Sequence, residues 1–151
     1  MDAYNFDDRG IRWNRFGDFE PRFDYVILNI DEKRRIADIL FKFPAEKQIV
    51  LHRHIALNHT FVVQGNHRLY EATGELSEDR PTGLYKIIPG NEKPHREGGG
   101  DQDTVVFFSI RADDSDDLYE LLDDALIPIA TVTFPMLIEL YQAQDTAAVA
   151  A

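Results

Sequence analysis

The sequence predicts an all-β fold, a barrel or a sandwich, that ends in one short helix. Short runs rich in β-branched and aromatic residues recur along the chain at fairly even spacing, with polar or glycine-containing segments between them. A length of 151 residues, of which 44% are hydrophobic, fits one domain with a core of its own. We therefore expect residues 1–151 to form a single domain, with its core over 23–132 and a flexible tail at 145–151.

The composition excludes several classes of protein. The chain carries 16 basic and 27 acidic residues, and its net charge of −11 repels nucleic acid and anionic lipid, so neither is an expected partner. The absence of cysteine excludes disulfides and thiolate metal sites. The start, MDAYNFDDRG, lacks the basic and apolar regions of a signal peptide, and no apolar stretch is long enough to span a membrane. A cytoplasmic protein is expected.

Three strands are expected in the first third of the chain. Residues 24–30 alternate in the manner of a half-buried strand. Residues 35–43 fit both helical spacing and a strand, and the strand is favoured because the neighbouring segments are strands. The segment 48–54 completes this group.

A hairpin is expected in the middle of the chain. Residues 60–64 and 67–72 have strand-like composition, and the dipeptide Gly65-Asn66 between them is typical of a two-residue hairpin turn, because both positions tolerate positive φ. The following segment, 72–82, is polar and rich in turn-forming residues, so it is expected to be a loop.

The second half holds four more expected strands and one expected helix. Residues 83–88 and 104–110 are rich in β-branched and aromatic residues, and 118–122 and 127–132 are two further short runs. The segment 89–103 is rich in glycine and charge, which predicts a long loop that acts as a mobile flap. Residues 134–144 carry apolar side chains at helical spacing.

The histidines form the most informative pattern in the sequence. All five lie in the middle of the chain, at His52, His54, His59, His67 and His95. His52 and His54 are two residues apart on an expected strand, so their side chains emerge on one face and can reach one ion. Neutral imidazole binds Zn, Fe, Ni and Cu, and a third ligand from a neighbouring strand would complete one side of a coordination sphere. The pattern predicts a site for one divalent metal ion.

Two segments resemble the motifs of the cupin family. The run PAEKQIVLHRHIALNHTFVVQG is similar to the first cupin motif, in which a His-x-His pair precedes an acidic residue and a hairpin glycine. Residues 83–95 are similar to the second motif, where a glycine and then a proline and a glycine precede a final histidine. The resemblance spans 23–130 and implies a cupin double-stranded β-helix, a jelly-roll barrel that holds a metal ion inside it.

The resemblance implies that His52, His54 and His95 are metal ligands. Asn58 stands where the first motif has its glutamate. Small single-domain cupins similar to acetylacetone and dihydroxyacetophenone dioxygenases also lack that glutamate and use three histidines. The second motif is longer by about one residue before His95, which is a departure from the family pattern.

Two further residues are candidates for the site, and each has a second interpretation. Glu71 lies where some relatives have a glutamate ligand, and its carboxylate would balance the charge of the ion; glutamate is also common on surface strands. His59 would point inward by alternation with Phe61 and Val63, as a ligand, as a catalytic proton donor to a bound oxygen group, or as a core histidine. His67, next to the turn, is expected to be exposed.

The resemblance implies two alternative functions. With Fe(II) as the favoured metal, and Zn or Ni as other occupants, three histidines leave room for a substrate that binds through two oxygens. Such a site implies a dioxygenase whose small-molecule substrate is a diketone or an aryl ketone. The alternative is a non-catalytic module that senses a metal or a ligand, similar to the cupin domain of an anti-sigma factor. The family also implies a homodimer.

Overall fold

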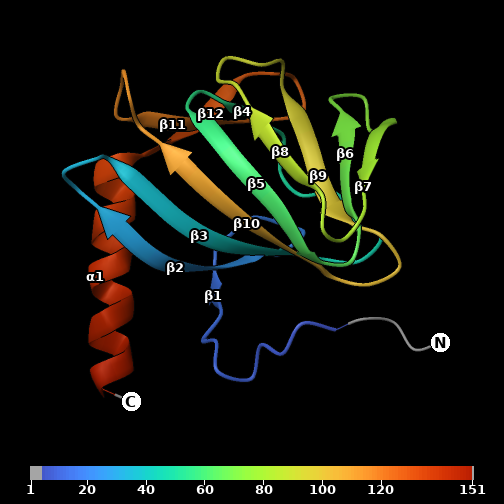
Figure 1. The fold of residues 1–151 in the computed structure, drawn as a ribbon. Helices are drawn as coiled ribbons and strands as arrows, with labels where there is room; N and C mark the ends of the chain where they lie inside the picture. Colours follow the sequence, from blue (N-terminus) through green and yellow to red (C-terminus); the bar gives the residue numbers. More distant parts are fainter. Residues whose placement is uncertain (1–4, 151) are drawn as a thin grey trace.

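The computed structural model describes residues 5–150, and the side chains of residues 5–144. This part of the chain forms twelve β-strands and one α-helix (Figure 1). In chain order they are β1 (Asn14–Arg15), β2 (Asp24–Asp31), β3 (Ile36–Phe43), β4 (His52–His54), β5 (Leu57–Gln64), β6 (His67–Glu71), β7 (Leu76–Arg80), β8 (Tyr85–Ile88), β9 (His95–Gly99), β10 (Thr104–Arg111), β11 (Asp117–Leu122), β12 (Pro128–Thr133) and α1 (Phe134–Ala150). The expected all-β class with a C-terminal helix is confirmed.

The strands form two six-stranded sheets that together make a jelly-roll barrel. One sheet has the order β1-β2-β3-β10-β5-β8, and the other has the order β12-β11-β4-β9-β6-β7. The paired strands are antiparallel throughout. The contact between β4 and β9 is the shortest of these pairings, with the single register pair His52–His95. The second sheet thus brings together two strands that are far apart in the sequence.

Most predicted elements are confirmed. The strands predicted over 24–30 and 35–43 are β2 and β3, and the four strands predicted in the second half are β8, β10, β11 and β12. The strand predicted over 48–54 is shorter, because regular pairing covers His52–His54 alone. The helix predicted over 134–144 is α1, which continues to Ala150, and residue 151 lies outside the described residues. The flexibility expected of 145–151 stays a prediction.

The predicted hairpin at Gly65-Asn66 is wrong, because the chain changes sheets there. β5 pairs with β10 and β8 in one sheet, whereas β6 pairs with β9 and β7 in the other. Gly65 has the expected positive φ, 69°, and a Cβ at this position would lie 3.0 Å from the backbone oxygen of Asp103. A positive φ allows a sharp change of direction, but it does not decide whether the flanking strands pair.

Two segments predicted as loops contain strands. β7 lies within 72–82, and β9 lies within 89–103. The prediction of a mobile flap is wrong, because β9 is an inner strand between β4 and β6. The sequence of β7, LSEDR, is polar because this strand forms an edge whose side chains are largely exposed. The sequence of β9, HREGG, lacks apolar residues because His95 and Glu97 extend into the site and its two glycines lie against neighbouring backbone.

The core lies between the two sheets and is rich in aromatic rings. Phe41 and Phe43 of β3 stack at 5.8 Å, and Phe108 of β10 meets both rings edge-on. The helix α1 packs against β2 (Figure 1). There the side-chain amide of Gln144 exchanges two hydrogen bonds with the backbone of Ile27, at 2.7 and 3.0 Å. In the part of the chain that the structure describes, no helix has the length and hydropathy needed to cross a membrane.

Candidate metal centre

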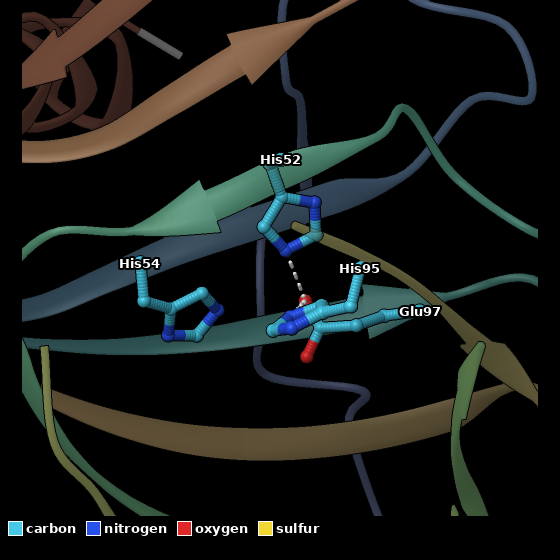
Figure 2. Close-up of side chains that lie close together, drawn as sticks. All are labelled: His52, His54, His95 and Glu97. Carbon is cyan, nitrogen blue, oxygen red and sulfur yellow. Dashed lines mark hydrogen bonds and ion pairs between the residues drawn. The ribbon is translucent and has the colours of Figure 1, made fainter. Parts of the chain in front are cut away.

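Four side chains converge on the inner face of the second sheet. His52 and His54 extend from β4, and His95 and Glu97 extend from the neighbouring strand β9 (Figure 2). Within each strand the two residues are two positions apart, so their side chains point to the same face. The register places His52 directly opposite His95, which brings the two pairs together. All four side chains are buried.

The ligand atoms of these four side chains are close enough to share one ion, since they all lie within 4.8 Å of one another. Metal–nitrogen bonds of about 2.1 Å place opposite ligands about 4.2 Å apart, so small side-chain shifts would suffice. Both ring nitrogens of His54 and Nε2 of His95 are buried without a hydrogen-bond partner among the described residues. Buried polar atoms are normally satisfied, and a neutral imidazole carries a lone pair on one of its two ring nitrogens. One nitrogen of His54 and Nε2 of His95 therefore fit a metal ion that accepts their lone pairs.

His52 is oriented for the same role by the backbone. Its Nδ1–H donates to the carbonyl oxygen of Val50 at 2.8 Å, which directs Nε2 into the cluster. Metal-binding histidines commonly donate their second ring nitrogen to such a carbonyl, and this bond fixes the tautomer. Three imidazoles and one carboxylate form a donor set that suits Fe(II), Zn and Ni. The residues present therefore fit a divalent metal ion.

Glu97 joins two imidazoles through its carboxylate. Oε2 lies 2.8 Å from Nε2 of His52, and Oε1 lies 2.8 Å from Nε2 of His67, whose ring stacks on Phe43. Burial acts to raise the pKa of Glu97, but the hydrogen bond and charge of His52, together with those of His67, outweigh it and hold this pKa well below its usual value. Glu97 thus supplies a negative charge beside the imidazoles.

The three histidines of the cluster differ in their affinity for protons. Burial lowers the pKa of His54 well below its usual value, and the charge of His95 adds to this effect. Burial lowers the pKa of His95 to about 3, and the charge of His52 adds to it. Burial also acts to lower the pKa of His52, but the hydrogen bond and charge of Glu97 outweigh it and raise that pKa. His54 and His95 are therefore neutral at neutral pH, with lone pairs available to an ion.

Asn58, in the place of the usual glutamate of the first motif, belongs to the wall of the site. Its amide oxygen accepts a hydrogen bond from the hydroxyl of Tyr119 at 2.8 Å, and its Nδ2 donates to the carbonyl oxygen of Ala56 at 3.0 Å. The ring of Tyr119 meets that of His54 edge-on at 4.9 Å. Burial raises the pKa of Tyr119 well above its usual value, so the hydroxyl stays protonated beside the cluster.

Two cavities adjoin the cluster. The smaller, about 30 Å³, is enclosed mainly by phenylalanine rings together with His52, Glu97 and Tyr119, and it has room for about one water-sized molecule. The larger, about 340 Å³, is lined by residues of β6, β7 and β8 together with His95. Of these two, the larger has the volume that a small organic ligand needs.

The three predicted histidine ligands lie in the cluster, whereas the predicted carboxylate does not. Glu71 is the last residue of β6, and its carboxylate pairs with Lys93 at 3.0 Å near the surface. The carboxylate beside the imidazoles belongs to Glu97, two residues after His95. Glu97 was not among the predicted ligands, because it lies in the segment 89–103 that was predicted to be a loop, where the spacing of two residues on a strand does not apply.

The positions predicted for His59 and His67 are both wrong: His59 lies outside the barrel and His67 lies inside it. His59 is half-buried on the outer face of β5 and hydrogen-bonded to the hydroxyl of Tyr85, so its predicted inward direction is wrong. The inward positions of β5 are mostly polar, and Phe61 is 40% exposed, so apolar alternation indicated the wrong face. His67, predicted to be exposed, is fully buried and bonded to Glu97.

Comparison with known proteins finds the fold but no close relative. No family model and no curated protein matches the sequence. Among solved structures, an RmlC-like cupin of Ralstonia eutropha is 19% identical with a TM-score of 0.72, and the match covers 97% of this chain and 89% of that one. An acetylacetone dioxygenase of Acinetobacter johnsonii is 12% identical with a TM-score of 0.66, over 95% and 93% of the two chains.

A third match is the anti-sigma factor ChrR of Rhodobacter sphaeroides, solved in complex with SigE. It is 19% identical with a TM-score of 0.53, and the match covers 68% of this chain and 50% of that one. Identities this low show a common fold and do not transfer an activity. The two-sheet jelly roll, the position of the histidine cluster inside it and these structural matches together show that the chain has the cupin fold.

Proposed function

We propose that this chain is a metal-dependent dioxygenase that uses Fe(II) to act on a small diketone or aryl ketone. The observation that carries the proposal is the buried cluster of three imidazoles and one carboxylate, next to a cavity with room for a small ligand. The similarity of fold to the acetylacetone dioxygenase of Acinetobacter johnsonii supports this class of reaction.

The residues of the chain would contribute to the reaction in three ways. His52, His54 and His95 would hold the ion, and Glu97 would offset part of its positive charge. The phenylalanine rings around the smaller cavity would exclude bulk water from one side of the site. The larger cavity would admit the substrate next to His95. Fe(II), when bound, would supply the one-electron chemistry with O₂ and a Lewis acid for oxygen atoms of a ketone.

Metal analysis tests the site. The protein is stripped with a chelator, reloaded with Fe(II) in the absence of oxygen, and analysed beside His54→Ala, His95→Ala and the control His59→Ala. We expect about one iron per chain in the wild type and in His59→Ala, and loss of most of the iron in the other two variants. Iron that survives both substitutions in the cluster would contradict the proposed site.

Oxygen uptake tests the reaction. An electrode would follow O₂ consumption by the iron-loaded protein after addition of acetylacetone, hydroxyacetophenone or the oxo acid benzoylformate. We expect uptake that requires both iron and substrate and that is lost in His54→Ala. If the fully loaded protein consumes no oxygen with any of these ketones, the proposal of a dioxygenase falls and the metal site stands.

A non-catalytic module that senses a metal or a small ligand is the second candidate. The cluster offers four buried ligand groups, and closed sites with four protein ligands are typical of structural metals, whereas catalytic sites keep a position open. The similarity of fold to the anti-sigma factor ChrR supports this alternative. Tight metal binding without oxygen uptake would favour the sensing module over the enzyme.

A further inference from the structure

Arg80 is a buried cation that lies outside the cluster of metal ligands. It is the last residue of β7, and only 4% of its surface is exposed. In the register of the second sheet it lies directly opposite His67, so the two side chains share the inner face of the sheet. His67 is in turn bonded to Glu97. The guanidinium of Arg80 therefore extends from the same face as the candidate metal ligands.

The guanidinium of Arg80 is incompletely paired. Its Nη2 donates to Oε2 of Glu78 at 3.0 Å, but Nε and Nη1 are buried and have no hydrogen-bond partner among the described residues. Glu78 is shared, because its other oxygen accepts a hydrogen bond from Lys86 at 2.6 Å. Unsatisfied donors on a buried charge are costly, and native proteins rarely keep them without a further partner. The missing partner would be an acceptor with negative charge.

The larger cavity brings Arg80 together with the metal cluster. Both Arg80 and His95 line this space of about 340 Å³, which suits a small organic molecule. Five other charged side chains line it. Glu71 pairs with Lys93, Glu78 pairs with Lys86 as well as with Arg80, and Glu92 is exposed. Among the positive and negative side chains that line this cavity, Arg80 is thus the buried one.

We propose that Arg80 binds the carboxylate of a small oxo acid whose carbonyl oxygen reaches the metal site beside His95. An anion in this place would occupy the unpaired donors and offset the buried positive charge. The substrate would then be a ketone that carries a carboxylate in addition to its carbonyl group. This inference rests on the proposed function, because it assigns the other end of the ligand to the metal.

Calorimetric binding of two acids and their esters tests the inference. The probes are pyruvate and benzoylformate, each compared with its methyl ester, which keeps the carbonyl group and removes the charge. The proteins are wild type, Arg80→Gln and the control Arg68→Gln, all loaded with Zn so that no turnover occurs. Arg68 is the matched control because it lies on the adjacent strand β6, on the opposite face, where it pairs with Asp79.

We expect the wild type to bind at least one of the two acids more tightly than its ester. Arg80→Gln should weaken the binding of that acid roughly tenfold to a hundredfold, the effect of one charge-assisted hydrogen bond, and leave the ester unchanged. Arg68→Gln should change neither. The inference is overturned if both esters bind the wild type as well as the acids do, and this comparison needs no variant that might misfold.

Further measurements separate this inference from the proposed function. The metal content of Arg80→Gln should equal that of the wild type, because Arg80 is not among the ligand groups. If the protein holds no metal but binds acids in a way that depends on Arg80, the anion site is supported and the proposal of a metal-dependent enzyme is contradicted. If the protein holds its metal but binds the acids no more tightly than their esters, the metal site is supported and the proposed role of Arg80 is contradicted.

Discussion

Glu97 is the residue on which the charge of the cluster depends. Its carboxylate accepts from His52 and His67 at 2.8 Å each, and it stands among side chains that burial keeps uncharged. A divalent ion that binds Nε2 of His52 must displace the proton that His52 shares with Glu97, since one nitrogen cannot serve both. The carboxylate would then face the ion, with His67 still holding its other oxygen.

Substitution of Glu97 should therefore weaken metal binding much more than substitution of Glu71. We expect Glu97→Gln to lower the affinity for Zn or Fe(II) about tenfold to a hundredfold, because the variant keeps the shape and loses the charge. Glu71→Gln removes an equal charge near the surface and should leave the affinity unchanged. Competition with a chromophoric chelator measures both constants, and equal affinities for the two variants would contradict the assignment of Glu97.

At the scale of residues, strand parity predicted part of the site and misled elsewhere. The pair His52 and His54 was predictable because a spacing of two on a strand fixes a common face. The same rule placed His59 inside, since it took the apolar side chains of β5 as the inner ones, whereas polar side chains face the barrel there. The burial of His67 follows from its neighbours in space, Phe43 and Glu97, which no local pattern reveals.

At the scale of elements, β9 determines whether the site exists. It supplies His95 and Glu97, and its glycines allow the neighbouring backbone to approach closely. A Cβ on Gly98 would lie 1.7 Å from the carbonyl oxygen of Lys47, and one on Gly99 would lie 2.6 Å from that of Gln102. Since backbone atoms cannot yield without moving a whole segment, β9 holds its position because it lacks side chains at these points.

Gly98→Ala should displace β9 and impair the metal site with it. We expect a loss of about 1–3 kcal/mol in the free energy of unfolding, as for overpacked interiors, together with weaker metal binding. Gly10→Ala is the matched control, because nothing lies within 4 Å of a Cβ at Gly10, and its effect should stay within about 0.5 kcal/mol. Urea unfolding measures the stability of both variants. A Gly98→Ala protein as stable as the wild type would contradict this account of β9.

Sequence patterns identified the strands with apolar side chains and also β4, but they missed β7 and β9. β2, β3 and β10 have hydrophobic faces, so their periodicity was visible. β7 and β9 contain mainly charged residues or glycine, and their strand conformation depends on pairing with β6 and β4. The separation of β5 from β6 could not be predicted either, because the turn at Gly65 has the same local chemistry in a hairpin.

At the scale of the whole molecule, the barrel withdraws the cluster from water. The two sheets enclose it with the aromatic rings of Phe41, Phe43 and Phe108 nearby, and burial keeps two of its imidazoles neutral.

On the outside, β12 forms an edge of the second sheet, with Ile127 and Ile129 more than half exposed on either side of Pro128. The expected homodimer, which such an edge would suit, stays a prediction.

The metal-free protein should lose stability as the pH falls from 6.5 towards 3. The pKa of His54 lies well below 6.5 and that of His95 is about 3 in the folded state, whereas both return to about 6.5 on unfolding. In this window the unfolded chain binds protons that the folded chain does not, so acid favours unfolding. His52, whose pKa is raised, contributes stability below pH 6.5 and loses it as the pH rises, so it does not oppose the trend.

Urea unfolding in the presence of a chelator at pH 6 and pH 5 measures this effect. We expect a lower free energy of unfolding at pH 5 in the wild type. His54→Gln should reduce the slope by about 1.4 kcal/mol per pH unit, since one proton fewer is bound on unfolding. Identical slopes for the wild type and the variant would show that His54 is not kept neutral by burial.

The short pairing between β4 and β9 means that a bound metal ion would also affect the stability of the barrel. These strands share one register pair, yet all four candidate ligands stand on them, and the long segment 55–94 separates them in the chain. The entropy of closing such a loop opposes their contact. An ion held by both strands would be a cross-link, the counterpart of a disulfide in a chain that has no cysteine. The supply of metal would then govern how firmly the barrel is closed, as well as whether it reacts.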